Sequence, residues 1–270
     1  MELEGAVAVV TGAASGIGRS LARALALDAG SVVVAADIDG TGAETVAAGI
    51  AAEAASGRRV GFAAEADVTD EAAVVALIDG VEESLGPVEL WCGNAGVSRM
   101  GGVERPNDEW NLVWDVNLMA HVIACRHLVP RWVERGSGHL LVTASAAGLL
   151  TGLGTASYAV TKHAAVALAE WIAITHGHDG VRVSCLCPQG VRTPMTESDW
   201  MLGVAQVEAL GMMEPEEVAA ATLEALRQDR FLILPHPEVE TYEQRRAGDR
   251  ERWLRGMRRM QQGLLGASGS

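Results

Sequence analysis

The sequence predicts an α/β fold in which a doubly wound parallel β-sheet carries helices on both faces. Short Val-rich apolar runs alternate along the chain with Ala-rich stretches of helical pattern. These runs are apolar throughout, as strands are when helix layers bury both faces of a parallel sheet. No linker of biased composition divides the 270 residues. The alternation therefore predicts a single domain of β-α units with right-handed crossovers.

Seven runs carry the strand pattern, at residues 6–12, 31–37, 59–67, 88–96, 138–146, 181–188 and 231–235. Helical patterns follow the first three runs, at residues 15–30, 41–57 and 70–86, and longer helical segments separate the later ones. This single domain is expected to span residues 1–262.

Two segments near the end of the chain break the β-α pattern. Residues 193–213 follow the sixth strand and are rich in Met, which suggests a small substrate lid; an ordinary amphipathic helix is the alternative. The segment from Glu238 onward has mixed charge, which predicts an exposed helix. Residues 263–270 are expected to form a disordered tail.

The composition indicates which classes of partner and which cellular compartment to expect. A formal net charge of −14 repels phosphate backbones and argues against a nucleic-acid partner. The first residues lack the basic region of a signal peptide, and no apolar stretch is long enough to predict a membrane span. The four cysteines have no CxxC spacing, so we expect no metal site and buried free thiols in a reducing, cytoplasmic compartment.

A glycine-rich turn lies between the first strand and the first helix, in the sequence TGAASGIG. Glycine lets the backbone turn sharply and approach a pyrophosphate, and the following helix aims free N–H groups at it. This strand–turn–helix context predicts a Rossmann-type dinucleotide site. Its candidate residues are Gly12, Ser15, Gly16, Ile17 and Gly18.

The end of the second strand predicts the cofactor. A carboxylate at Asp37 would accept hydrogen bonds from both ribose hydroxyls of NAD and would repel the extra phosphate of NADP. Ile38 and Asp39 follow, and no Arg is present to hold that phosphate. NAD is therefore expected rather than NADP. Asp67, with Val68, closes the third strand and would hold the adenine amino group or cap the following helix.

Four residues suggest proton transfer. Tyr158 and the only lysine, Lys162, are four apart in a helical pattern, so their side chains share a face. A nearby ammonium favours the phenolate and lowers the pKa of a tyrosine. Ser145, at the end of the fifth strand, can donate a hydrogen bond to a substrate oxygen. Asn117 falls within a helical pattern that does not favour Asn, which suggests a functional role.

In these motifs and their order, the chain resembles the short-chain dehydrogenase/reductase family, in its shorter, roughly 250-residue form. The resemblance implies that Tyr158 is the general acid/base, that Lys162 holds the nicotinamide ribose, and that Ser145 polarises the substrate oxygen. It further implies that Asn117 anchors a water that relays protons through Lys162. The remaining cofactor contacts implied by the resemblance are Asn94, Ala95, Gly96, Pro188, Gln189, Val191 and Thr193.

The chain departs from the family pattern at Gly93, where a second Asn is common, and at Gln189, where Gly usually follows the proline. The expected substrate is a hydrophobic or alicyclic secondary alcohol, or its ketone. Its predicted contacts, besides Ser145 and Tyr158, are Val97, Ala147, Gln189, Met195 and Trp200. A 3-oxoacyl-type reductase and a catalytically idle NAD(H)-binding regulator are the alternatives. The family also implies a homo-oligomer, a tetramer or a dimer.

Overall fold

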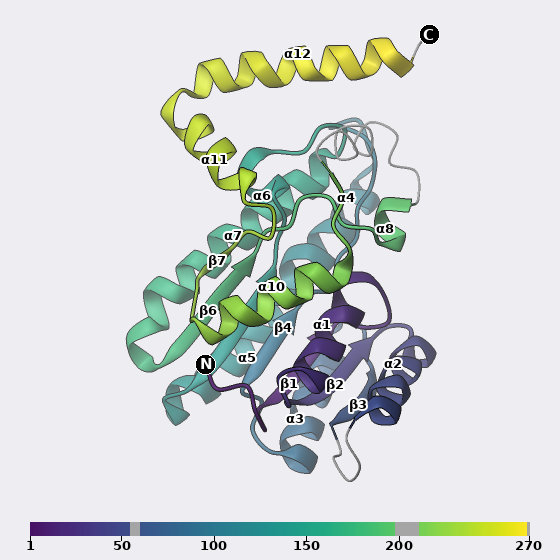
Figure 1. Ribbon diagram of the computed structural model, residues 1–270, viewed down its shortest axis with the longest axis vertical. Helices are drawn as coiled ribbons and strands as arrows, with labels where there is room; N and C mark the ends of the chain where they lie inside the picture. The colour runs from purple at the N-terminus through teal and green to yellow at the C-terminus, as the bar shows by residue number, and fades with distance from the viewer. Residues whose placement is uncertain (55–59, 198–210, 269–270) are drawn as a thin grey trace.

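The computed structural model describes residues 1–54, 60–197 and 211–268, and it contains one seven-stranded parallel sheet (Figure 1). The strand order is β3-β2-β1-β4-β5-β6-β7. The strands are β1 (Val7–Thr11), β2 (Val32–Asp37), β3 (Gly61–Glu65), β4 (Leu90–Gly93), β5 (Gly138–Thr143), β6 (Val181–Leu186) and β7 (Leu232–Ile233). All seven coincide with predicted runs, and the doubly wound α/β fold is confirmed.

Helices cover both faces of the sheet. They are α1 (Gly16–Leu27), α2 (Gly40–Glu53), α3 (Glu71–Leu85), α4 (Asn107–Trp114), α5 (Ala120–Arg135), α6 (Ala147–Leu150), α7 (Ala156–His176), α8 (Pro194–Glu197), α10 (Pro215–Arg227), α11 (Glu238–Gly248) and α12 (Arg250–Ser268). A π-helical turn, η1 (Asp115–Met119), joins α4 to α5, and a 3₁₀ turn, η2 (Gly177–Asp179), follows α7.

The period of two along the strands divides the core into two layers. In β1, Val7 and Val9 pack in the layer that α3, α5 and α7 cover, whereas Ala8 and Val10 pack in the layer that α1 and α10 cover. Every residue of β1 is buried, which explains why the strand is apolar throughout. The strand order reverses between β1 and β4, and in such sheets ligands bind at the carboxyl ends of the strands beside that reversal.

The end of the chain corrects one expectation. Helix α12 continues through Ser268, so residues 263–268 are helical and not a disordered tail. Leu264, Leu265 and Ala267 are good helix formers, and they favour continuation of the helix despite Gly263 and Gly266. Residues 269–270 lie outside the described part of the chain. Helix α12 projects beyond α11 at one end of the molecule (Figure 1).

The helical run Asn107–Arg135, which comprises α4, η1 and α5, is long and apolar enough to cross a membrane by length and composition alone. However, 56% of its most apolar window is buried inside the protein. Core helices that pack on a sheet have the same properties, so this run is weak evidence for a membrane span.

Candidate active site

The glycine-rich turn lies at the carboxyl end of β1 and requires its glycines. Gly12 and Gly16 have positive φ angles of 65° and 52°. A Cβ at Gly12 would lie 2.8 Å from the Cα of Ala95, and one at Gly18 would lie 2.1 Å from the carbonyl oxygen of Gly12. Side chains at these positions would therefore disrupt the turn. Helix α1 begins at Gly16, as predicted, so its free N–H groups face the edge of the sheet.

A cavity of about 530 Å³ lies at this edge of the sheet. It is lined by all the predicted cofactor residues except Gly18, which is buried within the turn. The lining residues among them are Gly12, Ser15, Gly16, Ile17, Asp37, Ile38, Asp67, Val68, Asn94, Ala95, Gly96, Tyr158, Lys162, Pro188, Gln189, Val191 and Thr193. The glycine turn, the Asp37 carboxylate and the cavity together suit an extended dinucleotide.

Two acidic residues of the cavity are held by the backbone. The Asp37 carboxylate accepts hydrogen bonds from the N–H groups of Ala14 (2.9 Å) and Asp39 (3.0 Å), which fixes it beside the glycine turn. Asp67 accepts from the backbone and hydroxyl of Thr69. Helix α3 is instead capped by Asp70, so the alternative that Asp67 caps this helix is wrong.

Asn94 ties two strand ends together. Its side-chain nitrogen donates to the Thr11 carbonyl at 3.1 Å, and its backbone N–H donates to the Thr11 hydroxyl at 3.0 Å. These bonds turn the chain out of β4 immediately after Gly93 and expose the next residues to the cavity.

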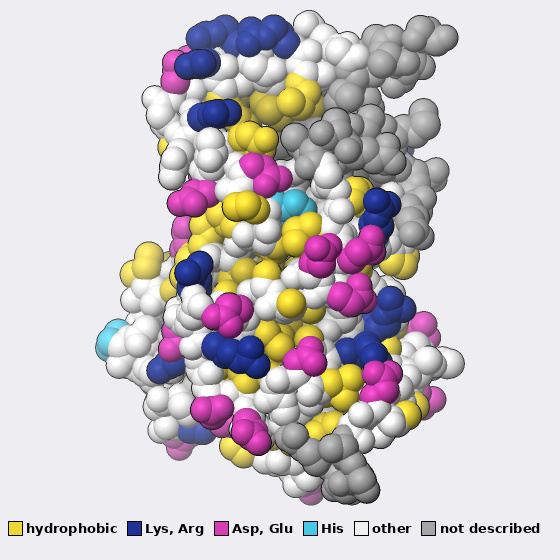
Figure 2. Space-filling view, viewed as in Figure 1, with side chains coloured by type: hydrophobic (Ala, Val, Ile, Leu, Met, Phe, Trp, Pro, Cys, Tyr) yellow, Lys and Arg dark blue, Asp and Glu magenta, His cyan; other side chains and the backbone are white. Residues whose placement is uncertain are grey.

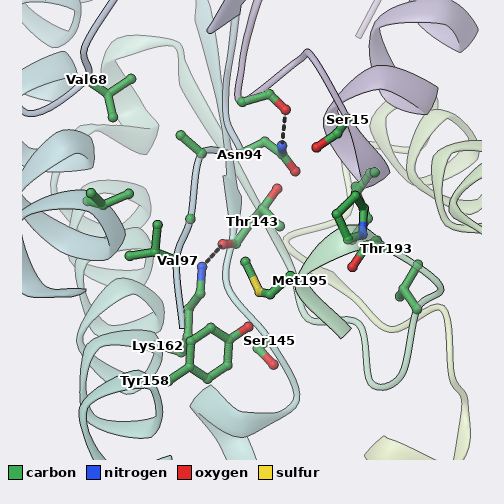
Figure 3. A pocket seen from close by; sticks show the side chains of 18 of the residues that line it. Ser15, Val68, Asn94, Val97, Thr143, Ser145, Tyr158, Lys162, Thr193 and Met195 are labelled. Carbon is green, nitrogen blue, oxygen red and sulfur yellow. Dashed lines mark hydrogen bonds between the residues drawn. The ribbon is translucent and has the colours of Figure 1, made fainter. Parts of the chain in front are cut away.

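The tyrosine, the serine and the lysine meet at the bottom of the cavity. In Figure 3 the hydroxyl of Tyr158, on α7, faces the side chain of Ser145, which follows β5, and the two form a hydrogen bond. The Nζ of Lys162 donates to the carbonyl of Thr143 at 2.8 Å and lies 5.6 Å from the centre of the Tyr158 ring. All three of these side chains are buried.

Burial dominates the protonation equilibria here. Desolvation raises the pKa of Tyr158, and the hydrogen bond with Ser145 opposes that shift. Desolvation also lowers the pKa of Lys162 to about 8. A buried amine with a pKa near neutrality can exchange its proton readily with a neighbouring group.

Asn117 is a structural link between two segments of the site. It lies in the π turn η1 rather than in the regular helix that the sequence suggested. Its side-chain oxygen accepts from the N–H of Val97 at 2.9 Å, and its nitrogen donates to the Val97 carbonyl and to the Thr161 hydroxyl. Both polar ends of the amide are therefore engaged by protein groups.

A histidine that the sequence patterns did not indicate lies against Gly93. His121, on α5, is buried, and a Cβ at Gly93 would lie 2.5 Å from its Nδ1. Burial, together with the charge of Lys162, lowers the pKa of His121 to about 3. The absence of a side chain at Gly93 therefore makes room for a neutral imidazole.

We expect Gly93→Asn, which introduces the residue common in the family, to lower the free energy of unfolding by about 2 kcal/mol through overpacking. Adding His121→Ala should recover most of that loss, because it removes the ring that clashes. Gly80→Asn is the control, because a Cβ at Gly80 meets nothing within 4 Å. Thermal unfolding followed by circular dichroism compares the three variants with wild type. An equal loss in Gly80→Asn would contradict this explanation.

Gln189, the second departure from the family pattern, lies between two cavities. Its backbone N–H donates to Nδ1 of His236 at 3.2 Å, and Nε2 of that ring bonds to the Gly190 carbonyl, so a histidine that the sequence did not single out holds this loop. Within the described residues, the buried side-chain nitrogen of Gln189 has no partner. It is thus available to the cofactor or to a substrate.

A second cavity, of about 800 Å³, adjoins the first at Ser145 and Gln189. One wall is formed by α6 and the residues after it. The other is formed by α11 and α12, and no sequence pattern had placed these two helices at the site. Of the predicted substrate residues, Ala147 lines this cavity, Val97 and Met195 line the first, and Trp200 lies outside the described residues.

Comparison with known proteins identifies the family. The short-chain dehydrogenase family model matches residues 6–201. The chain belongs to this family. It is therefore an oxidoreductase of the class that acts on CH–OH groups, as the ordered motifs predicted.

Named relatives are similar along most of the chain. A 1-deoxy-11-beta-hydroxypentalenate dehydrogenase of Streptomyces avermitilis is 42% identical over 89% of this chain and 88% of its own. The meso-2,3-butanediol dehydrogenase of Serratia marcescens is 35% identical over 82% of this chain and 86% of its own. A short-chain dehydrogenase/reductase of Burkholderia phymatum, solved in complex with NAD, superposes with a TM-score of 0.84 at 31% identity and covers 93% of this chain and 96% of its own.

Proposed function

We propose that this short-chain dehydrogenase interconverts a hydrophobic or alicyclic secondary alcohol and its ketone with NAD as the hydride carrier. The observation that carries the proposal is the position of the Tyr158 and Ser145 hydroxyls. Ser145 lines both the nucleotide-sized cavity and the largely apolar second one, and Tyr158 lines the first cavity beside it. A reacting carbon placed there would touch both the proton-transfer group and the cofactor.

In this mechanism Ser145 donates a hydrogen bond to the substrate oxygen, and Tyr158 as phenolate accepts the hydroxyl proton. Bound NAD⁺ would supply the acceptor for the hydride of the carbinol carbon and a positive ring that favours the phenolate. Lys162 adds its own positive charge, with its Nζ 5.6 Å from the centre of the tyrosine ring. Reduction of the ketone reverses the proton transfer.

The proton then needs a path to solvent. We assign Asn117 to the relay through Lys162, but its amide is already bonded to Val97 and Thr161. A π turn shifts the backbone hydrogen-bonding pattern and is frequent at functional sites. The relay water would therefore be held by the backbone of η1, while the Asn117 side chain fixes the position of that turn.

The residues that line the first cavity fit NAD. Gly12, Gly16 and the start of α1 would hold the pyrophosphate, and Asp37 the ribose hydroxyls. Lys162 would hold the nicotinamide ribose. An anionic Asp37 without a neighbouring Arg favours NAD over NADP.

Asp37→Ser should lower kcat/KM with NAD about 10- to 100-fold, because the ribose loses a charge-assisted acceptor. The same change should raise kcat/KM with NADP by relieving repulsion of the phosphate. Steady-state assays with both cofactors measure the ratio of kcat/KM with NAD to kcat/KM with NADP. Asp39→Asn is the matched control: Asp39 caps α2 outside the cavity, and Asn caps a helix equally well. An unchanged ratio in Asp37→Ser would contradict this assignment.

We further propose a cytoplasmic homo-oligomer, a tetramer or a dimer, that associates through α4 and α7. Both helices expose large apolar side chains, which association would bury. Examples are Leu112, Trp114, Val160, Trp171 and Ile174, the last 81% exposed. Light scattering of the purified protein distinguishes these assemblies from a monomer.

The reaction is tested by following NADH absorbance with a panel of alicyclic secondary alcohols and their ketones. Turnover with NAD supports the proposal. NADH binding without turnover of any panel member would instead favour the idle regulator.

A further inference from the structure

The second cavity is the place where the body of a substrate would lie. It opens at Ser145, so a molecule whose hydroxyl reaches the catalytic pair must extend into this space. Its walls are mostly apolar, with Leu150 and Leu153 on one side and Trp253, Met257 and Met260 on the other. A ring system or another compact hydrocarbon would be desolvated against these side chains.

Three arginines also line the cavity: Arg245 on α11, and Arg252 and Arg259 on α12. Figure 2 shows basic side chains gathered along α12 at the top of the view, above hydrophobic ones. Arg252 and Arg259 are seven residues apart and so share one face of the helix with Gly256 and Met260. Arg258 lies on the opposite face of α12 and is not part of the lining.

These arginines lack acidic partners. Across residues 1–54, 60–197 and 211–268, no salt bridge involves Arg245, Arg252 or Arg259, although the chain has 35 acidic and only 21 basic residues. One carboxylate, Asp249, lines the same cavity, and it accepts the backbone N–H of Arg252 at the start of α12. Its charge is thus partly compensated by the helix terminus, and the wall stays positive.

Resting on the proposed function, we propose that the substrate is an apolar alicyclic alcohol that also carries a carboxylate. The hydroxyl-bearing carbon lies at Ser145 and Tyr158, the rings lie against Trp253 and Met257, and the carboxylate binds the guanidinium groups of α11 and α12. Guanidinium binds carboxylate through two parallel hydrogen bonds, which fixes orientation as well as adding affinity. This would select which end of the molecule reaches the nicotinamide.

The test uses a matched pair of substrates, a hydroxydecalin carboxylic acid and its methyl ester, with the full-length protein and NAD. Wild type should show a KM about 10- to 100-fold lower for the acid, with similar kcat for both. The double variant Arg252→Gln/Arg259→Gln should lose that preference and keep its kcat for the ester. Arg258→Gln is the matched control and should retain the preference.

Equal KM values for acid and ester in wild type, or a double variant that raises both KM values equally, would overturn the carboxylate site and leave the dehydrogenase function intact. If neither compound is turned over, calorimetric titration of the NADH-loaded protein with the acid and with the ester tests the carboxylate site directly. Binding of the acid and not of the ester supports the site even where the proposed reaction fails. Equal binding of both, or binding of neither, overturns it.

Discussion

Tyr158→Phe is expected to lower kcat for alcohol oxidation by about a thousandfold and to leave NADH binding intact. The change removes only the hydroxyl that takes up the substrate proton, and general acid/base groups contribute about 10²- to 10⁴-fold to such rates. The ring stays in its buried place on α7, so the cavity keeps its shape. Steady-state rates and NADH fluorescence titration measure the two effects separately.

The assignment of Tyr158 as the acid/base group also predicts how the oxidation and reduction rates change with pH. Burial raises the pKa of Tyr158, so the phenolate required for oxidation should become more populated as the pH rises. The oxidation rate of wild type should therefore increase toward alkaline pH, and ketone reduction should show the opposite trend. A variant that retains a rate within tenfold of wild type, or a wild-type oxidation rate that falls with rising pH, would contradict this role of Tyr158.

The fold could be predicted because its strands are buried on both faces. A buried parallel strand must be apolar at every position, and that leaves a local signature such as VAVVT in β1 or VVVAAD in β2. Local patterns do not reveal a π turn, because the sequence around Asn117 has an ordinary helical pattern. The extra residue in the turn is imposed by the tertiary bonds from Asn117 to Val97 and Thr161.

The residues that line the first cavity could be predicted for a related reason. Gly12 and Gly16 have the positive φ angles of a tight turn after β1, and Asp37 ends β2, so each belongs to a local strand-end pattern. The substrate side depends on contacts between distant segments. Nothing near Gly93 indicates that His121 occupies the adjacent space, and nothing in the amphipathic pattern of α12 says which surface its apolar face covers. Such pairings are visible only in three dimensions.

Lys162→Met should abolish catalysis and yet make the protein more stable. A pKa of about 8, against 10.5 for an ordinary lysine, corresponds to a cost of about 3 kcal/mol for keeping the charged amine buried at pH 7. Methionine fills similar space without that cost, but it forfeits the hydrogen bond to the Thr143 carbonyl, worth about 1 kcal/mol. The net gain of about 2 kcal/mol would raise Tm by several degrees.

The sign of the pH dependence separates this explanation from a general packing effect. Below pH 8 the lysine is protonated in both states, so the full cost is present in wild type. Between pH 8 and 10.5 the folded protein releases the proton while the unfolded chain retains it, so the stability of wild type rises with pH through this window. The advantage of Lys162→Met should therefore shrink across the same window. Chemical unfolding of wild type and Lys162→Met without cofactor, at pH 7 and pH 10, measures the difference in their free energies of unfolding. A constant difference would show that the amine carries no desolvation cost, and the site would then not be holding its catalytic charge at the expense of stability.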